Sequence, residues 1–286
     1  MPRTLIEPQE LAAHLADPDW AIVDCRFELT RPEWGARAFA AGHVPHAVYA
    51  DLERDLSGAV GPASGRHPLP AVTALAATFG RLGIDARVQV IAYDQGPGMY
   101  AARLWWLLRW LGHAEVAVLD GGFAAWERAG LPVASEAQPR PARHFSAHEQ
   151  PGAHVTSERI AQLVASGALR RGETLLVDAR AADRFAGQNE TIDPIAGHVP
   201  GARNHPFAGN LGADGRFLEP RELHRRWEAT LGGGSAARAI LMCGSGVSAC
   251  HDLLALEVAG LPGARLYGGS WSEWIRDPAH AIARGP

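Results

Sequence analysis

The chain of 286 residues contains an internal repeat, and this repeat strongly limits what the chain can fold into. Three short blocks occur twice in the same order, at offsets of 154, 155 and 147 residues. They are residues 22–26 (IVDCR) with 176–180 (LVDAR), 42–45 (GHVP) with 197–200 (GHVP), and 119–122 (LDGG) with 266–269 (LYGG). Offsets this long exclude a short-period solenoid and indicate that one whole domain has been duplicated.

Each copy of the repeat alternates short apolar runs with segments of helical spacing. In the first copy the apolar runs are residues 21–24, 88–93 and 114–119, which we expect to be buried strands. This alternation is typical of an α/β fold in which helices flank a mainly parallel sheet. We therefore predict two tandem domains of one kind, at residues 1–135 and 153–286, with a proline-containing linker at 136–152.

The composition excludes several classes of protein. A net charge of −4 offers no basic face for nucleic acid or for an anionic membrane. No apolar run reaches the ~18–20 residues of a membrane span, and the first residues lack the apolar core of a secretory signal. Three cysteines argue against a disulfide framework and favour the reducing cytoplasm. No Cys-x-x-Cys or His-Glu-x-x-His pattern occurs, so we expect neither a metal nor a cofactor.

The second strong signal is the stretch 239–258. An apolar run ends at Cys243, small residues follow, and an apolar-periodic segment comes next, which predicts a strand, a tight loop and a helix. Backbone N–H groups of the loop and the helix N-terminus would favour negative charge on the Cys243 sulfur. A buried structural cysteine is the alternative, and the thiolate-stabilising surroundings favour the reactive interpretation.

The residues 243–250 (CGSGVSAC) resemble the active-site loop of the rhodanese superfamily. Within that superfamily they resemble the 3-mercaptopyruvate sulfurtransferase branch, because Gly244 and Ser245 stand where the thiosulfate branch usually has a basic residue. The resemblance implies that Cys243 is a nucleophile that holds sulfur as a persulfide. It also implies that the loop residues bind the donor; these are Gly244, Gly246, Val247 and Ser248, the last in place of the usual threonine.

An anionic sulfur donor requires a cation beside the sulfur. Arg184 matches the substrate-binding arginine of the family, and a planar guanidinium binds a carboxylate in bidentate fashion. The 3-mercaptopyruvate branch usually has a second donor-binding arginine shortly before the second GHVP block. Residues 189–194 (NETIDP) contain no arginine, so one of the two arginines that would bind the donor is missing there or is supplied from elsewhere.

The same branch is thought to relay protons through a serine, a histidine and an acid. Ser245 and His67 match the serine and the histidine, and Glu53 falls at the acid position, where the family usually has aspartate. Histidine suits this task because its unperturbed pKa lies near neutrality. An exposed loop histidine beside prolines is the alternative interpretation of His67.

The first copy carries Asp94 where the second copy carries Cys243. A carboxylate cannot accept a sulfane sulfur, so we expect the first domain to be catalytically silent, as it is in tandem members of the family. Cys25 and Cys250 are expected to be buried structural residues.

The sequence therefore predicts a sulfurtransferase that moves sulfur from 3-mercaptopyruvate, a small anionic donor, through a Cys243 persulfide. The acceptor would be cyanide, a small thiol or a thioredoxin-like protein, with no nucleic-acid or membrane partner. Thiosulfate as the donor is the alternative, and a non-catalytic sulfur-relay or binding module is a more distant one. A cysteine phosphatase or arsenate reductase is disfavoured, because the loop lacks the arginine that would hold a tetrahedral oxyanion.

Overall fold

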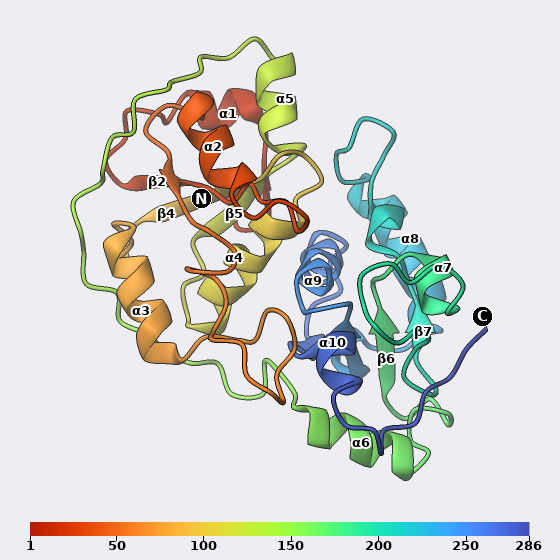
Figure 1. Cartoon of the computed structure of the whole chain (residues 1–286). Helices are drawn as coiled ribbons and strands as arrows, with labels where there is room; N and C mark the ends of the chain where they lie inside the picture. Colours follow the sequence, from red (N-terminus) through yellow and green to blue (C-terminus); the bar gives the residue numbers. More distant parts are fainter. Residues whose placement is uncertain (286) are drawn as a thin grey trace. The chain divides into compact units, whose positions relative to one another are not determined.

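A computed structural model describes residues 1–285, which form two compact units (Figure 1). Unit 1 consists of residues 1–58, 70–150 and 213–217. Unit 2 consists of residues 59–69, 151–212 and the chain from Leu218 onward. Segment 59–69, from the first half of the chain, thus belongs to unit 2. Segment 213–217, from the second half, belongs to unit 1. The compact units differ in this respect from the continuous domains 1–135 and 153–286, which stay a prediction.

Unit 1 is built on a five-stranded parallel sheet in the order β1-β5-β4-β2-β3. Its strands are β1 (Leu5–Ile6), β2 (Trp20–Asp24), β3 (Val48–Tyr49), β4 (Gln89–Tyr93) and β5 (Val116–Leu119). Its helices are α1 (Pro8–Ala12), α2 (Trp34–Ala41), α3 (Val72–Arg81), α4 (Met99–Trp110) and α5 (Gly122–Arg128). All residues of β2, β4 and β5 are buried, as expected for central strands covered on both faces.

Unit 2 repeats this plan with a four-stranded parallel sheet in the order β7-β6-β8-β9. The strands are β6 (Leu175–Asp178), β7 (Arg203–Asn204), β8 (Ala239–Met242) and β9 (Arg265–Leu266). The α-helices are α6 (Ser157–Ala165), α7 (Ala182–Phe185), α8 (Pro220–Leu231), α9 (Ser248–Val258) and α10 (Ser270–Trp274), and the 3₁₀ helices are η1 (Phe207–Asn210) and η2 (Ala236–Arg238). The predicted α/β architecture with parallel sheets is confirmed. No helix in the described part of the chain is long and apolar enough to cross a membrane.

The three repeated sequence blocks meet at one buried arginine in each unit. In unit 2 the Arg180 guanidinium donates to Asp178 Oδ2 at 2.7 Å and to the Gly197 carbonyl at 2.8 Å. It also lies 4.8 Å from the centre of the Trp271 ring, which follows the third block. Arg26 makes the corresponding contacts in unit 1. Because a buried charge is costly unless it is paired and hydrogen-bonded, these blocks must stay together in both copies.

The segment 213–217 is held on unit 1 by polar contacts. The Phe217 N–H donates to Asp120 Oδ1 at 2.9 Å, and Arg216 pairs with Glu7 at 2.7 Å. Burial raises the pKa of Asp120 from 3.8 to about 6, although the Phe217 N–H opposes the shift. The folded protein therefore binds the Asp120 proton more tightly than the unfolded chain does.

The raised pKa of Asp120 predicts a pH-dependent stability. Its contribution is fully present below pH 3.8 and is lost as the pH rises through about 6, a change of at most about 3 kcal/mol. Asp120→Asn stays neutral and keeps an oxygen for the Phe217 N–H. The melting temperature of this variant, measured against the wild type, should therefore rise progressively between about pH 4 and pH 7. Glu10→Gln, at an exposed position on α1, should show no comparable trend, and a flat difference for Asp120→Asn would contradict the assignment.

Candidate active site

Cys243 lies at the carboxyl end of β8, the position where α/β sheets commonly place ligands. Its side chain is only 2% exposed. The Gly246 N–H donates to Cys243 Sγ at 3.1 Å, and the Cys243 N–H donates to Ser270 Oγ at 3.0 Å. Gly246 has a φ of +77°, and a side chain there would collide with the Gly268 carbonyl. The loop thus requires glycine at this position to aim an N–H at the sulfur.

The equivalent loop of unit 1 shows which chemistry this backbone favours. The Asp94 carboxylate accepts backbone N–H groups from Gly96 and Gly98, both at 2.9 Å, and from Tyr100 at 3.0 Å. Burial raises the pKa of Asp94, and the backbone N–H groups oppose that shift. One strand–loop–helix geometry therefore surrounds a carboxylate in unit 1 and a sulfur in unit 2. Because several backbone N–H groups point at Asp94 and the Gly246 N–H points at Cys243 Sγ, both loops are suited to negative charge.

Segment 59–69 lies against the beginning of α10. The Arg66 N–H donates to Ser272 Oγ at 3.0 Å, and Arg276 Nε donates to the Ser64 carbonyl at 3.3 Å. A Cβ on Gly65 would lie only 2.6 Å from the Gly269 carbonyl oxygen, so only glycine allows this close approach of the two backbones. The segment is therefore attached at Ser64, Gly65 and Arg66. These contacts fix the positions of the Arg66 and His67 side chains.

His67 and Ser245, predicted from separate parts of the sequence, come together. His67 Nδ1 lies 2.8 Å from Ser245 Oγ, and both residues are buried. Glu53, the third predicted relay residue, belongs to unit 1; it is exposed, and its N–H donates to Asp51 Oδ1 at 3.0 Å. Its participation in a relay stays a prediction.

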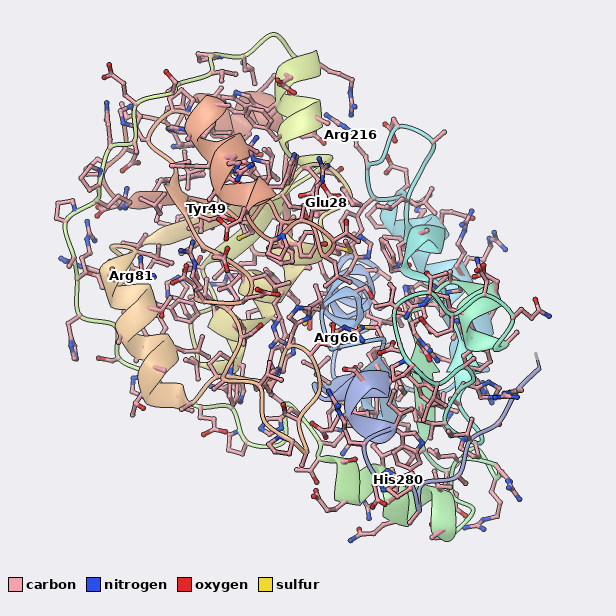
Figure 2. All side chains as sticks on the ribbon, in the orientation of Figure 1. Glu28, Tyr49, Arg66, Arg81, Arg216 and His280 are labelled. Atoms are coloured by element: carbon pink, nitrogen blue, oxygen red, sulfur yellow. The ribbon has the colours of Figure 1, made fainter. Side chains whose placement is uncertain are left out.

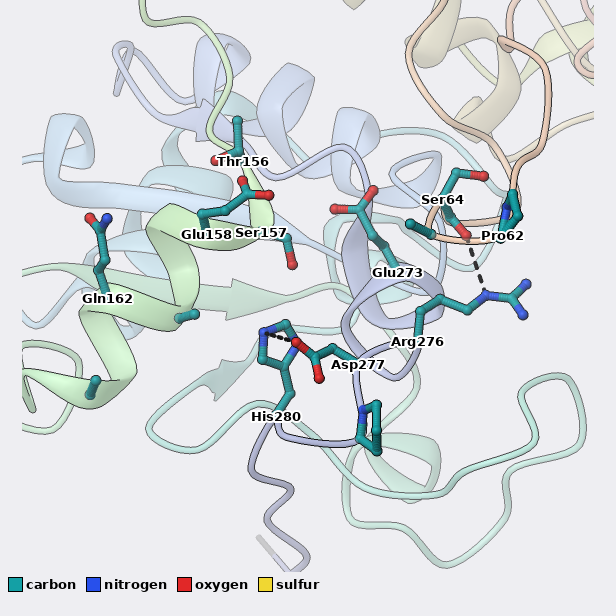
Figure 3. Close-up of a pocket in the computed structure, with 14 residues that line it drawn as sticks. Pro62, Ser64, Thr156, Ser157, Glu158, Gln162, Glu273, Arg276, Asp277 and His280 are labelled. Atoms are coloured by element: carbon teal, nitrogen blue, oxygen red, sulfur yellow. Dashed lines mark hydrogen bonds and ion pairs between the residues drawn. The ribbon is translucent and has the colours of Figure 1, made fainter.

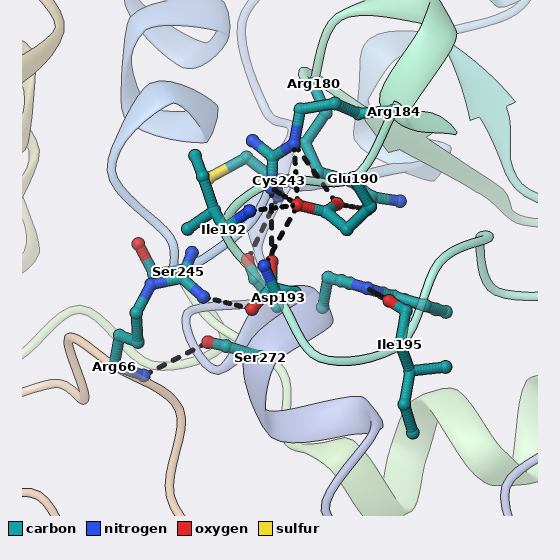
Figure 4. Close-up of polar contacts among 12 residues, drawn as sticks. Arg66, Arg180, Arg184, Glu190, Ile192, Asp193, Ile195, Cys243, Ser245 and Ser272 are labelled. Atoms are coloured by element: carbon teal, nitrogen blue, oxygen red, sulfur yellow. Dashed lines mark hydrogen bonds and ion pairs between the residues drawn. The ribbon is translucent and has the colours of Figure 1, made fainter. Parts of the chain in front are cut away.

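Arg184 belongs to a cluster of charged side chains beside the cysteine loop (Figure 4). Its Nε lies 3.1 Å from both carboxylate oxygens of Glu190, and its Nη2 lies 3.1 Å from Asp193 Oδ2. Asp193 also forms an ion pair with Arg66, a residue of segment 59–69 (Figure 4). Figure 2 labels Arg66 among all the side chains of the protein. The position that a Cβ on Gly244 would occupy lies 2.8 Å from Arg66 Nη2 and 3.7 Å from Arg184 Nη2. Two guanidinium groups therefore face the residue that follows the cysteine.

Glu190 organises the turn that carries Asp193. Its Oε1 accepts the backbone N–H groups of Ile192 and Asp193 at 2.9 and 3.0 Å. Burial acts to raise the pKa of Glu190, but these N–H bonds and Arg184 outweigh it, so the pKa is lowered. Burial raises the pKa of Asp193, although Arg66 opposes the shift. The turn thus holds an ionised glutamate beneath the arginines.

The remaining predicted residues have clear positions. Val247 is buried directly before α9, and Ser248 is half-buried as the first residue of that helix. Cys250 is buried, with its Sγ donating to the Gly246 carbonyl at 3.2 Å. Burial raises the pKa of the Cys25 thiol, which disfavours a reactive thiolate there. Within residues 1–285 no cluster of His, Cys, Asp or Glu could hold a metal ion.

The sequence interpretation missed four residues of this site: Arg66, Glu190, Asp193 and Ser270. Ser270 has a φ of +55°, an unusual conformation for a residue with a side chain, and its Oγ accepts the Cys243 N–H. In unit 1 the corresponding residue is Gly122, with a φ of +57°. The repeated blocks of the sequence align Gly122 with Gly269 rather than with Ser270, so the sequence alone provided no signal for this residue.

A groove of about 1180 Å³ lies elsewhere on unit 2 (Figure 3). It is lined by the beginning of segment 59–69, by α6 and by the turn after α10, including Ser64, Glu158, Glu273 and His280. No residue of the 243–248 loop lines it. The groove is therefore separate from the loop that carries Cys243.

Comparison with known proteins places this geometry among enzymes of sulfur transfer. The family model for the rhodanese-like domain matches residues 7–129 and 162–277. A Pseudomonas aeruginosa protein with 3-mercaptopyruvate sulfurtransferase in its name is 49% identical over 284 residues, covering 98% of both chains. The SseB protein of Mycobacterium tuberculosis, with thiosulfate sulfurtransferase in its name, is 39% identical over 99% of this chain and 98% of its own length. The crystal structure of SseA from Escherichia coli, described as a 3-mercaptopyruvate sulfotransferase, has a TM-score of 0.80 at 32% identity and covers 95% of this chain and 100% of SseA.

The loop geometry predicts unequal effects for two glycine substitutions. Gly246→Ala introduces both a positive-φ alanine and a collision with the Gly268 carbonyl. Gly233→Ala is the matched control, because its φ is +71° and nothing lies within 4 Å of the added methyl group. The control should lose about 1 kcal/mol of unfolding free energy, and Gly246→Ala should lose roughly 3 kcal/mol or more. Only Gly246→Ala should also change the rate at which iodoacetamide alkylates Cys243; equal behaviour of the two variants would contradict the assigned geometry.

Proposed function

This chain belongs to the rhodanese family, and on that premise we propose that it is a sulfurtransferase that takes sulfur from 3-mercaptopyruvate through a persulfide on Cys243. The observation that carries the proposal is the contact between His67 Nδ1 and Ser245 Oγ, because Ser245 lies on the loop that carries Cys243 and His67 is brought to it by segment 59–69. A thiolate can both accept a sulfur atom and release it again, which other side chains cannot do.

The first half-reaction begins with attack of the Cys243 thiolate on the thiol sulfur of 3-mercaptopyruvate. A sulfur–sulfur bond forms and the bond between sulfur and C3 of the donor breaks. The electron pair of the broken bond remains on the carbon fragment, which leaves as the enolate of pyruvate. Cys243 now carries a persulfide, and the enolate gains one proton at C3 to become pyruvate. The Gly246 N–H, 3.1 Å from Sγ, stabilises the charge on sulfur before the attack.

Proton transfer distinguishes this donor from thiosulfate. Sulfite, the product from thiosulfate, leaves as a stable anion and needs no proton, whereas the enolate does. A histidine that contacts a serine hydroxyl at 2.8 Å can deliver a proton through that hydroxyl. The pair therefore supports 3-mercaptopyruvate as the donor, with Ser245 as the group nearest the leaving carbon and His67 behind it. We propose Glu53 as the acid of the relay, which would act on His67 rather than on the donor.

Thiosulfate is the second candidate donor. It is favoured by the 39% identity to a relative that has thiosulfate sulfurtransferase in its name. It would be bound by the same guanidinium groups, since it too is a small anion, and its transfer would produce the same persulfide. The two donors therefore differ in the leaving group rather than in the nucleophile.

In the second half-reaction an acceptor attacks the outer sulfur of the persulfide, and the Cys243 thiolate leaves. Cyanide, a small thiol or a thioredoxin-like protein would all serve, since each offers a nucleophilic carbon or sulfur. Three free cysteines, one of them the nucleophile, suit a reducing compartment, and we place the protein in the cytoplasm.

The persulfide can be detected directly. After treatment with 3-mercaptopyruvate and removal of excess donor, peptide mass spectrometry should find an adduct of about 32 Da, one sulfur atom, on Cys243. Cys243→Ser should lose the adduct and all transfer while retaining its fold, because the change is nearly isosteric. Cys250→Ser is the matched control and should keep both. An adduct on Cys25 or Cys250 in the wild type would contradict the assignment.

The proposed proton transfer predicts a donor-dependent effect of two substitutions. His67→Ala and Ser245→Ala should each lower kcat with 3-mercaptopyruvate by about 100- to 10,000-fold, the usual contribution of general acid–base catalysis. Turnover with thiosulfate should fall much less. Steady-state kinetics with both donors gives the ratio of kcat with 3-mercaptopyruvate to kcat with thiosulfate. If the wild type prefers thiosulfate and the ratio is unchanged in both variants, thiosulfate is the donor and the pair has a structural role only.

A further inference from the structure

We propose that Ser272 is a positioning residue that holds His67 against Ser245 by attaching segment 59–69 to the cysteine loop. The inference rests on the proposed function, because it assigns the residue that presents His67 for proton transfer. Ser272 is the third residue of α10 and is only 3% exposed. Its role is to place other side chains, so its effect on the reaction is indirect.

The first turn of α10 holds the backbone of the cysteine loop. The Trp271 N–H donates to the Cys243 carbonyl at 3.0 Å, and the Ser272 N–H donates to the Gly244 carbonyl at 2.9 Å. Both bonds join backbone atoms only, so a change of the Ser272 side chain leaves them in place. Ser272 is therefore fixed relative to Gly244 and to Ser245, the next residue of the loop.

The Ser272 side chain contacts segment 59–69 (Figure 4). Its Oγ accepts the Arg66 N–H at 3.0 Å. The hydroxyl can donate its own proton to the Gly269 carbonyl, 3.5 Å away, which leaves the oxygen lone pairs for the Arg66 N–H. A Cβ on Gly65 would lie only 2.8 Å from Ser272 Oγ, so the oxygen packs directly against the backbone of the segment.

These two contacts of Ser272 lie next to the two members of the proposed relay. Gly244 directly precedes Ser245, and Arg66 directly precedes His67. One residue thus holds the neighbours of both side chains, whose Nδ1 and Oγ atoms lie 2.8 Å apart. Without Ser272 Oγ the Arg66 N–H loses its acceptor, and a donor left without a partner costs free energy that favours opening of the segment. The contact between His67 and Ser245 therefore depends on this hydroxyl.

Amide hydrogen exchange tests the attachment without any sulfur transfer. In Ser272→Ala, peptides that cover residues 59–69 should exchange ~10-fold faster, because the segment opens more easily when the Arg66 N–H has no acceptor. Peptides that cover residues 239–250 should keep their exchange rate, since the backbone bonds from α10 remain. Ser157→Ala is the matched control. It removes a hydroxyl that accepts the Tyr267 O–H at 3.0 Å, and it should leave the exchange of residues 59–69 unchanged.

A double-mutant cycle with His67 tests what the attachment does for the reaction. Ser272→Ala should lower kcat with 3-mercaptopyruvate by ~10-fold, a part of the ~100-fold or more that general acid–base catalysis contributes. Turnover with thiosulfate should fall much less. In the His67→Ala background the same substitution should cause no further loss, because Ser272 acts through His67. Ser157→Ala should leave kcat with both donors unchanged.

Two results would overturn the proposal. One is an unchanged exchange rate of residues 59–69 in Ser272→Ala. The other is an equal loss of kcat in the wild-type and His67→Ala backgrounds, which would mean that Ser272 acts independently of His67. If the segment exchanges faster in Ser272→Ala but His67→Ala leaves turnover of 3-mercaptopyruvate unchanged, the attachment by Ser272 stands and the proposed proton transfer fails.

Discussion

The site depends on the attachment of segment 59–69 to the cysteine loop of unit 2. The contact between His67 Nδ1 and Ser245 Oγ joins two residues that lie 178 positions apart in the chain. The backbone of Gly65 approaches Gly269 so closely that no side chain fits between them. Because one short segment makes these contacts, His67 and Arg66 reach the cysteine loop together. Any displacement of the segment would therefore remove both side chains from the loop at the same time.

The duplicated fold shows how one backbone geometry serves two purposes. Both units end a central parallel strand in a loop whose backbone N–H groups donate to one side chain: several donate to Asp94 in unit 1, and the Gly246 N–H donates to Cys243 in unit 2. The carboxylate of Asp94 uses those N–H groups to satisfy its own buried charge. In the proposed reaction the Cys243 sulfur accepts the Gly246 N–H and acts as the nucleophile. The predicted silence of the first domain thus follows from the group that occupies the loop.

Much of this architecture could be predicted from the sequence, because the signals were local or repeated. The tandem α/β fold, the family and the strand–loop–helix around Cys243 are confirmed, and the predicted pair of Ser245 and His67 lies in contact. The pairing of Arg66 with Asp193 could not be predicted, because it joins positions 127 residues apart and neither residue matches the expected arginine position. For the same reason, hydrophobic periodicity could not predict that segment 59–69 belongs to unit 2 and segment 213–217 to unit 1.

In the proposed reaction, the segment carrying His67 supplies a proton to the carbon leaving group. Single-turnover formation of the Cys243 persulfide in H₂O and in D₂O measures this directly. A normal solvent isotope effect is expected with 3-mercaptopyruvate and none with thiosulfate, because only the first donor leaves a carbanion-like fragment that must be protonated. Equal isotope effects for the two donors would contradict it.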